Sequence, residues 1–191
     1  MTGGLILAAG AGTRFGPHSP KQLAPLRGRP LLEWAVRAQC AVPGLDRIVV
    51  VLGSRAADVR AAVAFGRADT IVCEDWESGQ AASLRRGLSE LAGSQRVVVT
   101  LGDAPLVTAG VIELFLAAEP RTRAVYDGRP GHPVVLGPEE IAALTSLDGD
   151  RGARGLLHGG PVVEVGHLCS GRDVDTPDDL EEISHEARAV I

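Results

Sequence analysis

Four short runs of apolar residues, separated by stretches with helical spacing, constrain the fold of this chain more than any other feature. They are Gly4–Ala9, Arg47–Leu52, Thr70–Cys73 and Arg96–Leu101. Strands that are apolar along their whole length are buried on both faces, as in parallel sheets covered by helices on both sides. The sequence therefore predicts an α/β fold, a three-layer, doubly wound and mostly parallel sheet.

Helices are expected between and after these strands. Apolar residues spaced on one helix face predict helices over 30–42, 55–64 and 78–91, and Thr108 is suited to cap another. Beyond about residue 122 we expect a small antiparallel addition, two short helices and a further strand, at Ala124–Tyr126, Pro133–Leu136, 139–144, 151–157 and Val162–Val165. Thr176-Pro177-Asp178-Asp179 has the pattern of a capping box and predicts the start of a last helix.

Charge and composition exclude several classes of partner. The formal net charge is −5 and aromatic residues make up 3% of the chain, which argues against nucleic acid and anionic membranes. Three widely spaced cysteines form no ligand pattern, and no apolar run approaches the ~20 residues that span a bilayer. We therefore expect a cytoplasmic protein, for which a small phosphorylated ligand remains open.

A glycine-rich segment follows the first predicted strand. It comprises Gly10-Ala11-Gly12-Thr13-Arg14-Phe15-Gly16, with Lys21 a few residues later. Glycines let backbone N–H groups approach a phosphate closely, and the arginine and lysine add positive charge. The spacing fits neither a Walker loop nor the dinucleotide fingerprint, which it misses by one residue. The segment is thus either a phosphate-binding loop of another kind or a structural glycine turn.

A single aspartate, Asp103, follows the fourth predicted strand, in Leu101-Gly102-Asp103-Ala104-Pro105. Ligands of open α/β sheets bind at the carboxyl ends of the strands, and carboxylate oxygens suit a hard cation such as Mg²⁺. The alternative is a turn aspartate that hydrogen-bonds to its own backbone. The sequence thus makes Asp103 a candidate metal ligand.

Two more aspartates, Asp173 and Asp175, precede the last predicted helix. Alternation along an extended segment places both on the same side. Either could complete a metal site with Asp103, and either could instead be a turn or cap residue. The run differs from the D-x-D-x-T motif of haloacid-dehalogenase phosphatases, because Thr176 stands three residues after the first aspartate and not four.

In their order along the chain, these motifs resemble the molybdopterin nucleotidyltransferases, the MobA-like NTP transferases, over nearly the whole sequence. Leu7–Gly16 followed by Lys21-Gln22-Leu23 is similar to the signature loop and lysine of that family, and Gly102–Pro105 to its metal-binding turn. The other matching segments are Trp76–Gln80, Ser83-Leu84, Gly87-Leu88, Gly131–Pro133, Gly149–Arg154 and Asp173–Pro177. The resemblance implies a Rossmann-like nucleotidyltransferase fold in a single domain, 1–191, with an NTP-binding half (1–110) and an acceptor-binding half (111–191).

The activity that this resemblance implies is Mg²⁺-dependent transfer of CMP from CTP to the terminal phosphate of molybdopterin, with release of pyrophosphate. Leu7-Ala8-Ala9-Gly10 and Gly149–Arg154 are similar to the cytidylyl branch, whereas guanylyltransferases tend to carry two glycines at positions 9 and 10. The expected partners are CTP, a phosphorylated small-molecule acceptor and, transiently, a molybdoenzyme or its chaperone.

Roles follow for individual residues. Arg14, Lys21 and Asp103 are expected to be catalytic, and Asp103 and Asp175 to hold Mg²⁺, with Asp173 as an alternate ligand. His132 and Asp173 are expected to contact the acceptor. The expected nucleotide contacts are Leu7, Ala8, Ala9, Gly10, Ala11, Gly12, Thr13, Arg14, Lys21, Gln80, Ser83 and Asp103.

Three alternatives stay open. The first is a guanylyltransferase or another NTP transferase that acts on a sugar phosphate or a different phosphorylated metabolite. The second is a non-catalytic nucleotide-binding accessory protein of a molybdoenzyme, against which the presence of Lys21 and Asp103 argues. The third is an α/β module without a ligand, which leaves the polar groups at the strand ends unexplained.

Overall fold

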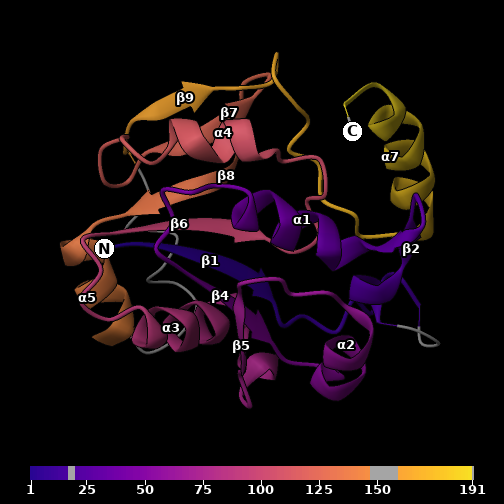
Figure 1. Ribbon diagram of the computed structural model, residues 1–191, viewed down its shortest axis with the longest axis horizontal. Coiled ribbons are helices and arrows are strands. Elements are labelled where there is room, and N and C mark those ends of the chain that lie inside the picture. The colour runs from indigo at the N-terminus through magenta and orange to yellow at the C-terminus, as the bar shows by residue number, and fades with distance from the viewer. Residues whose placement is uncertain (17–19, 147–158, 191) are drawn as a thin grey trace.

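A mixed seven-stranded sheet runs through the molecule (Figure 1). The computed structural model describes residues 1–16, 20–146 and 159–190. The strands are β1 (Thr2–Ala8), β4 (Arg47–Leu52), β5 (Asp69–Val72), β6 (Arg96–Leu101), β7 (Arg123–Tyr126), β8 (Arg129–Leu136) and β9 (Val162–Glu164). The α-helices are α1 (Leu31–Cys40), α2 (Ala56–Ala62), α3 (Gln80–Glu90), α4 (Ala109–Leu114), α5 (Pro138–Ser146) and α7 (Pro177–Val190).

The strand order is β5-β4-β1-β6-β8-β7-β9. The first four strands in this order are parallel, with β1 between β4 and β6. β8 runs antiparallel to both β6 and β7, and β9 is parallel to β7. The predicted α/β class is confirmed, including the antiparallel addition in the C-terminal half.

Helices cover both faces of the sheet. Because side chains alternate along a strand, Leu5 and Leu7 of β1 pack on the side of α3 and α5, whereas Ile6 and Ala8 pack on the side of α1, α2 and α4. Figure 1 shows α3 and α5 together on one side of the sheet. A third apolar cluster joins α7 to α1 through Ile183, Leu31 and Leu26. The three-layer prediction holds, and α7 is fixed beside the N-terminal half.

Some elements carry no periodic signal and were not predicted. They are the 3₁₀ turns η1 (Lys21–Leu23) and η2 (Trp76–Ser78) and the two-stranded hairpin of β2 (Pro25–Leu26) and β3 (Arg29–Pro30). In the hairpin turn, Arg27 and Gly28 both have positive φ, of 50° and 80°, as a tight turn between twisted strands requires. The helix predicted at 151–157 and the Gly149–Arg154 motif lie outside the described residues.

The capping prediction for the last helix is confirmed. The Asp179 backbone N–H donates to Thr176 Oγ1 at 3.2 Å, and the Thr176 N–H donates to Asp179 Oδ2 at 2.8 Å. The Asp175 N–H donates to the same carboxylate at 3.0 Å. This reciprocal cap fixes the segment that carries Asp173 and Asp175.

Candidate functional site

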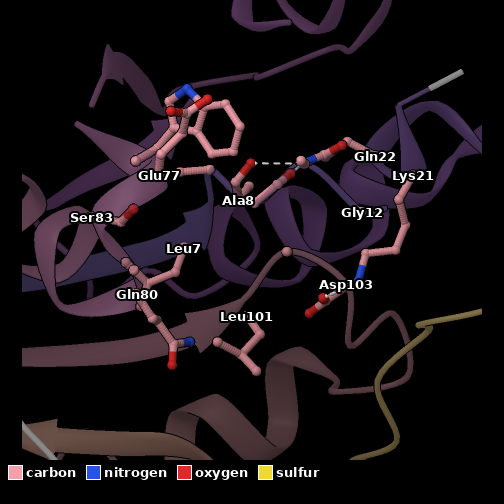
Figure 2. Close-up of a pocket in the computed structure, with 16 residues that line it drawn as sticks. Leu7, Ala8, Gly12, Lys21, Gln22, Glu77, Gln80, Ser83, Leu101 and Asp103 are labelled. Atoms are coloured by element: carbon pink, nitrogen blue, oxygen red, sulfur yellow. Dashed lines mark hydrogen bonds and ion pairs between the residues drawn. The ribbon is translucent and has the colours of Figure 1, made fainter. Parts of the chain in front are cut away.

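A cleft of about 320 Å³ lies where the parallel strands β1 and β6 end. Four segments form it: the end of β1 with the glycine loop, η1, the turn from η2 into α3, and the end of β6 (Figure 2). Its lining is Leu7, Ala8, Ala9, Gly10, Ala11, Gly12, Lys21, Gln22, Trp76, Glu77, Gly79, Gln80, Ser83, Leu101, Gly102 and Asp103. The cleft thus occupies the edge at which α/β sheets bind ligands.

The glycine loop presents free backbone donors to this cleft. Within the part of the chain that the structure describes, no acceptor engages the backbone N–H groups of residues 9–14. The carbonyl groups of the loop, in contrast, are engaged, since Ala9 O accepts from the Ser54 N–H at 3.0 Å and Gly12 O from the Phe15 N–H at 2.8 Å. A run of unpaired amides beside a cleft is a site for an anion.

Glycine is required at two positions of this wall. Gly12 has a φ of 63°, and a Cβ there would lie 2.8 Å from the Lys21 Cβ. A Cβ on Gly102 would lie 2.8 Å from the Ala8 Cβ and 2.7 Å from a methyl group of Leu32. The loop therefore approaches Lys21, and the end of β6 approaches β1, more closely than any larger residue allows.

Lys21 joins two carboxylates from distant parts of the chain. Its Nζ lies 2.6 Å from Asp103 Oδ2 and 3.2 Å from Asp175 Oδ1, and Figure 2 shows it extended toward Asp103. Arg14 reaches the other oxygen of Asp175, at 3.0 Å. The Val174 N–H donates to the Asp103 carbonyl at 2.9 Å, which holds the two aspartate segments side by side. The loop cations and the two aspartates thus form one network.

The comparison with known families decides the class of protein. The sequence model of the MobA-like NTP transferase domain matches residues 4–165. The chain belongs to this family. The expected family resemblance is confirmed.

Relatives of the MobA-like chain are known by sequence. It is 40% identical over 117 residues to the bifunctional protein GlmU of Nitratidesulfovibrio vulgaris, covering 60% of this chain and 25% of that protein. It is 38% identical over 122 residues to the 2-C-methyl-D-erythritol 4-phosphate cytidylyltransferase of Cereibacter sphaeroides, covering 61% of this chain and 53% of that protein. These matches span only a quarter to a half of the relatives.

Solved structures share the fold over nearly the full length. Rv0371c from Mycobacterium tuberculosis H37Rv superposes with a TM-score of 0.82 at 32% identity, covering 96% of this chain and 97% of that one. Its homolog from Mycobacterium sp. strain JC1 has a TM-score of 0.82 at 27% identity, covering 100% of this chain and 98% of that one. This structural agreement covers nearly the whole chain, whereas the sequence matches to GlmU and the cytidylyltransferase cover 60% and 61% of it.

Charges in the network shift two pKa values of the MobA-like protein. Burial alone lowers the pKa of Lys21, but Asp103 and Asp175 outweigh it and the net pKa is raised, so the ammonium stays charged at neutral pH. Loss of hydration at the Asp173 carboxyl group, together with the negative charges of Asp103 and Asp175, raises the pKa of Asp173 to about 7. Three carboxylates thus meet near one lysine, and this concentration of negative charge favours a cation.

The donors of this corner fit a hard divalent cation. Asp103 Oδ2 and Asp175 Oδ1 both lie within hydrogen-bonding distance of the Lys21 Nζ, so the two carboxylates converge on one point. Oxygen donors of this kind suit Mg²⁺, which commonly takes one or two protein carboxylates and completes its shell with phosphate oxygens and water. Among the described residues, no group of three or more acidic, histidine or cysteine side chains forms a ready-made cage. The corner therefore suits a cation that arrives with a phosphate ligand.

The expected nucleotide contacts gather in the cleft, except Thr13 and Arg14, which do not line it. Arg14 instead lies outside the cleft and forms an ion pair with Asp175. Gln80 and Ser83 enter from the start of α3, and Figure 2 shows Leu7 near them. Asp175 contacts Lys21 directly, whereas Asp173 lines a second cavity and has no hydrogen bond to Lys21 in the described structure. Asp175 is therefore better placed than Asp173 to hold a cation together with Asp103.

A second, larger cavity of about 820 Å³ adjoins Asp173, and we call it the acceptor-side groove. It lies between the β7–β8 turn, the segment 166–173 and α7. Its lining is Tyr126, Asp127, Arg129, Pro130, Gly131, Gly166, His167, Leu168, Cys169, Ser170, Gly171, Arg172, Asp173 and Glu186. His132, an expected acceptor contact, is half-buried and lines neither cavity. Its pKa is lowered to about 4 by burial and by the charge of Arg123, so the imidazole is neutral at pH 7.

Gln22 lies in the site but was not predicted from the sequence as a contact. It is buried, lines the cleft and donates to two carbonyl groups of the glycine loop. Trp76, Glu77 and Gly79 also line the cleft. They belong to the segment that resembles a nucleotide-contacting segment of the family, in which only Gln80 was predicted as a contact. No helix of the described chain is both long and apolar enough to cross a membrane.

Proposed function

We propose that the protein transfers a nucleoside monophosphate from an NTP, with CTP favoured, to the phosphate of a small acceptor, and releases pyrophosphate. The observation that carries the proposal is the convergence of unpaired loop amides, Lys21 and two carboxylates at one edge of the cleft. A triphosphate with a divalent cation is the ligand that this combination of donors and acceptors suits.

In the reaction, the protein positions the two substrates and neutralises their negative charge. The amides of residues 9–14 hold the β- and γ-phosphates, while Lys21 and Arg14 offset the charge of the two approaching anions. An oxygen of the acceptor phosphate attacks the α-phosphorus, a new P–O bond forms there, and the bond to the bridging oxygen breaks as pyrophosphate leaves. The nucleophile is already anionic at neutral pH, so no general base is required.

Asp103 and Asp175 would hold the Mg²⁺, with Asp173 as the alternate ligand. When bound there, the cation would offset the negative charge that builds on the leaving pyrophosphate. The solved complex of Rv0371c with manganese, 32% identical to this chain with a TM-score of 0.78, supports a divalent cation in this fold.

CTP is favoured on two grounds. Leu7-Ala8-Ala9-Gly10 resembles the cytidylyl branch, and this stretch lines the cleft. One of the relatives is itself named a cytidylyltransferase.

The sequence resemblance favours molybdopterin as the acceptor. A second candidate is a sugar or sugar-alcohol phosphate, which the 38% identity to a 2-C-methyl-D-erythritol 4-phosphate cytidylyltransferase supports. The two acceptors differ most in the bulk that lies beyond the reacting phosphate. The acceptor-side groove, which adjoins Asp173, is the region that would distinguish the two acceptors by this bulk.

The test measures pyrophosphate release with each of CTP, GTP, ATP and UTP, in the presence of Mg²⁺ and either molybdopterin or methylerythritol phosphate. We expect release with CTP and one acceptor, and its loss in Asp103→Ala. Release with GTP would keep the mechanism and overturn the choice of base. Binding of CTP without release with any acceptor in a wider panel of phosphorylated metabolites would overturn the transfer activity.

A further inference from the structure

Gln22 occupies an unusual position between the glycine loop and the body of the protein. Only 5% of its surface is exposed, and it belongs to the turn η1 directly after Lys21. Its Nε2 donates to Ala8 O at 2.9 Å and to Gly10 O at 2.8 Å (Figure 2 draws Gln22 beside Ala8). The reverse orientation of the amide would place Oε1 against two carbonyl oxygens, so chemistry fixes which atom faces the loop.

These two bonds set the direction of two backbone amides. In a planar trans peptide the N–H points opposite to the C=O. Holding Ala8 O and Gly10 O toward Gln22 therefore turns the N–H groups of Ala9 and Ala11 away from it. The Ser54 N–H does the same from the β4–α2 connection by binding Ala9 O at 3.0 Å, which turns the Gly10 N–H. Three consecutive carbonyls are thus held by the framework, and the three amides that follow stay free.

The remaining polar atom of the Gln22 side chain adds nothing to the stability of the fold. Gln22 Oε1 is buried and has no hydrogen-bond partner in the described part of the chain. A buried acceptor without a partner costs free energy, which an apolar side chain of the same size would avoid. What distinguishes Gln22 is the place of its Nε2 contacts, which both go to the backbone where β1 passes into the glycine loop.

We infer that Gln22 is a positioning residue for the triphosphate: it holds the loop so that the amides of Ala9 and Ala11 face the ligand. The inference rests on the proposed binding of an NTP in the cleft. Without the Gln22 donors, the peptide planes after Ala8 and Gly10 can turn, and a carbonyl oxygen that faces the cleft would repel a phosphate. Gln22 acts through the loop and makes no contact with the reacting atoms.

The experiment compares Gln22→Met, which keeps the volume without the donors, with Gln22→Glu, whose carboxylate faces the two carbonyl oxygens. Gln39→Met is the matched control. Gln39 is a second buried glutamine that donates to a β1 carbonyl, Leu5 O, and also has an unpaired Oε1, but it does not line the cleft. Binding of CTP and of tripolyphosphate, each with Mg²⁺ and without acceptor, is measured by calorimetry and by the fluorescence of Trp76, which lines the cleft.

We expect Gln22→Met to weaken the binding of both ligands about tenfold, the effect of losing hydrogen bonds to the loop. The melting temperature should change little, because removing the unpaired Oε1 offsets the cost of leaving Ala8 O and Gly10 O without this donor. Gln22→Glu should weaken them further, and Gln39→Met should leave both affinities unchanged. In the steady state, the KM for CTP should rise in Gln22→Met while the KM for the acceptor stays constant. Tripolyphosphate contains no base, so its weaker binding would locate the effect in the loop amides.

Wild-type affinity of Gln22→Met for both ligands would overturn the inference. So would equal losses of affinity in Gln22→Met and Gln39→Met that follow their losses of thermal stability. Failure of the proposed function is a separate result: the wild-type protein would then bind CTP but transfer CMP to no acceptor, and the affinities of the variants would still decide the role of Gln22.

Discussion

The two cavities of this protein are built from different materials. The nucleotide cleft, of about 320 Å³, has one wall of small residues and backbone at the glycine loop, and Lys21 and Asp103 are the charged groups at that end. The acceptor-side groove, of about 820 Å³, is lined by charged side chains from the start of β8, the segment 166–173 and α7, among them Arg129, Arg172 and Glu186. A wall of backbone amides suits what triphosphates have in common, whereas side chains that line a groove can be exchanged to suit different acceptors. The comparison implies one fixed site and one variable site.

The largest effect should follow from Asp103→Asn, because the substitution removes a charge from the fixed site. We expect kcat to fall by about 10²–10³-fold, as for other groups that stabilise developing charge, with little change in the affinity for CTP. Asp127→Asn, an exposed acid of the acceptor-side groove, is the control and should retain activity. Pyrophosphate release measures both variants, and equal losses would remove the distinction between the two cavities.

The next effect concerns Lys21→Met. The variant should lose about 100-fold in kcat/KM for CTP, within the range for losing an electrostatic group. Since the pKa of Lys21 is raised in the fold, its stabilising charge is fully present at pH 7 and is lost only as the pH rises past the usual lysine range. The variant should therefore lose about 1–3 kcal/mol of unfolding free energy at pH 7, as for hydrogen bonds to charged groups.

Addition of Mn²⁺ to the Lys21→Met variant tests whether the two aspartates hold a metal ion. The cation would replace the ammonium between Asp103 and Asp175, so Mn²⁺ should raise the melting temperature of the variant more than that of the wild-type protein. Thermal unfolding with and without Mn²⁺ measures this difference. An equal response of both proteins would argue against a metal site at the two aspartates.

A smaller effect is expected at His132, beyond the cleft. Its folded pKa, lowered to about 4 from an ordinary value of 6.5, means that the unfolded chain binds the proton more readily. The stability that the neutral imidazole contributes is present above pH 6.5 and is lost as the pH falls toward 4. As the pH falls across this interval, the unfolding free energy of His132→Asn should therefore decrease by about 1–3 kcal/mol less than that of the wild-type protein. Urea unfolding across the interval measures it, and parallel curves would show that His132 is not buried as described.

The smallest effect should come from Arg129→Ala. Arg129 is exposed, lines the acceptor-side groove and has no ion-pair partner among the residues that the structure describes. An exposed charge contributes little, so we expect the KM of the acceptor to rise about two- to fivefold and that of CTP to stay constant. Arg37→Ala on α1 is the control, and a rise in the KM of CTP would show that the two cavities are not separate in function.

The sequence predicts the nucleotide cleft better than the groove, for a physical reason. β4 and β6 span the predicted residues because apolar, β-branched runs leave few other conformations. The loop glycines, Lys21 and Asp103 stand near strand ends, and the parallel sheet brings those ends to one edge. Backbone sites of this kind leave a spacing in the sequence that can be recognised.

The rest depends on contacts between distant residues that have no local pattern. Gln22 looks like any polar residue in a loop until its two carbonyl partners are seen. Alternation placed Asp173 and Asp175 on one side, but only the pairing of Val174 with the Asp103 carbonyl determines that Asp175 meets Lys21. The hairpin of β2 and β3 is too short to show any periodicity.

The most direct test of the nucleotide cleft is a crystal structure with Mn²⁺ and a CTP analogue that cannot release pyrophosphate. The expected result is an anomalous Mn²⁺ peak beside Asp103 and Asp175, with the β- and γ-phosphates on the amides of residues 9–14 and the cytosine beyond Ala9. A triphosphate bound in the acceptor-side groove, or Mn²⁺ held away from both aspartates, would contradict the proposed reaction.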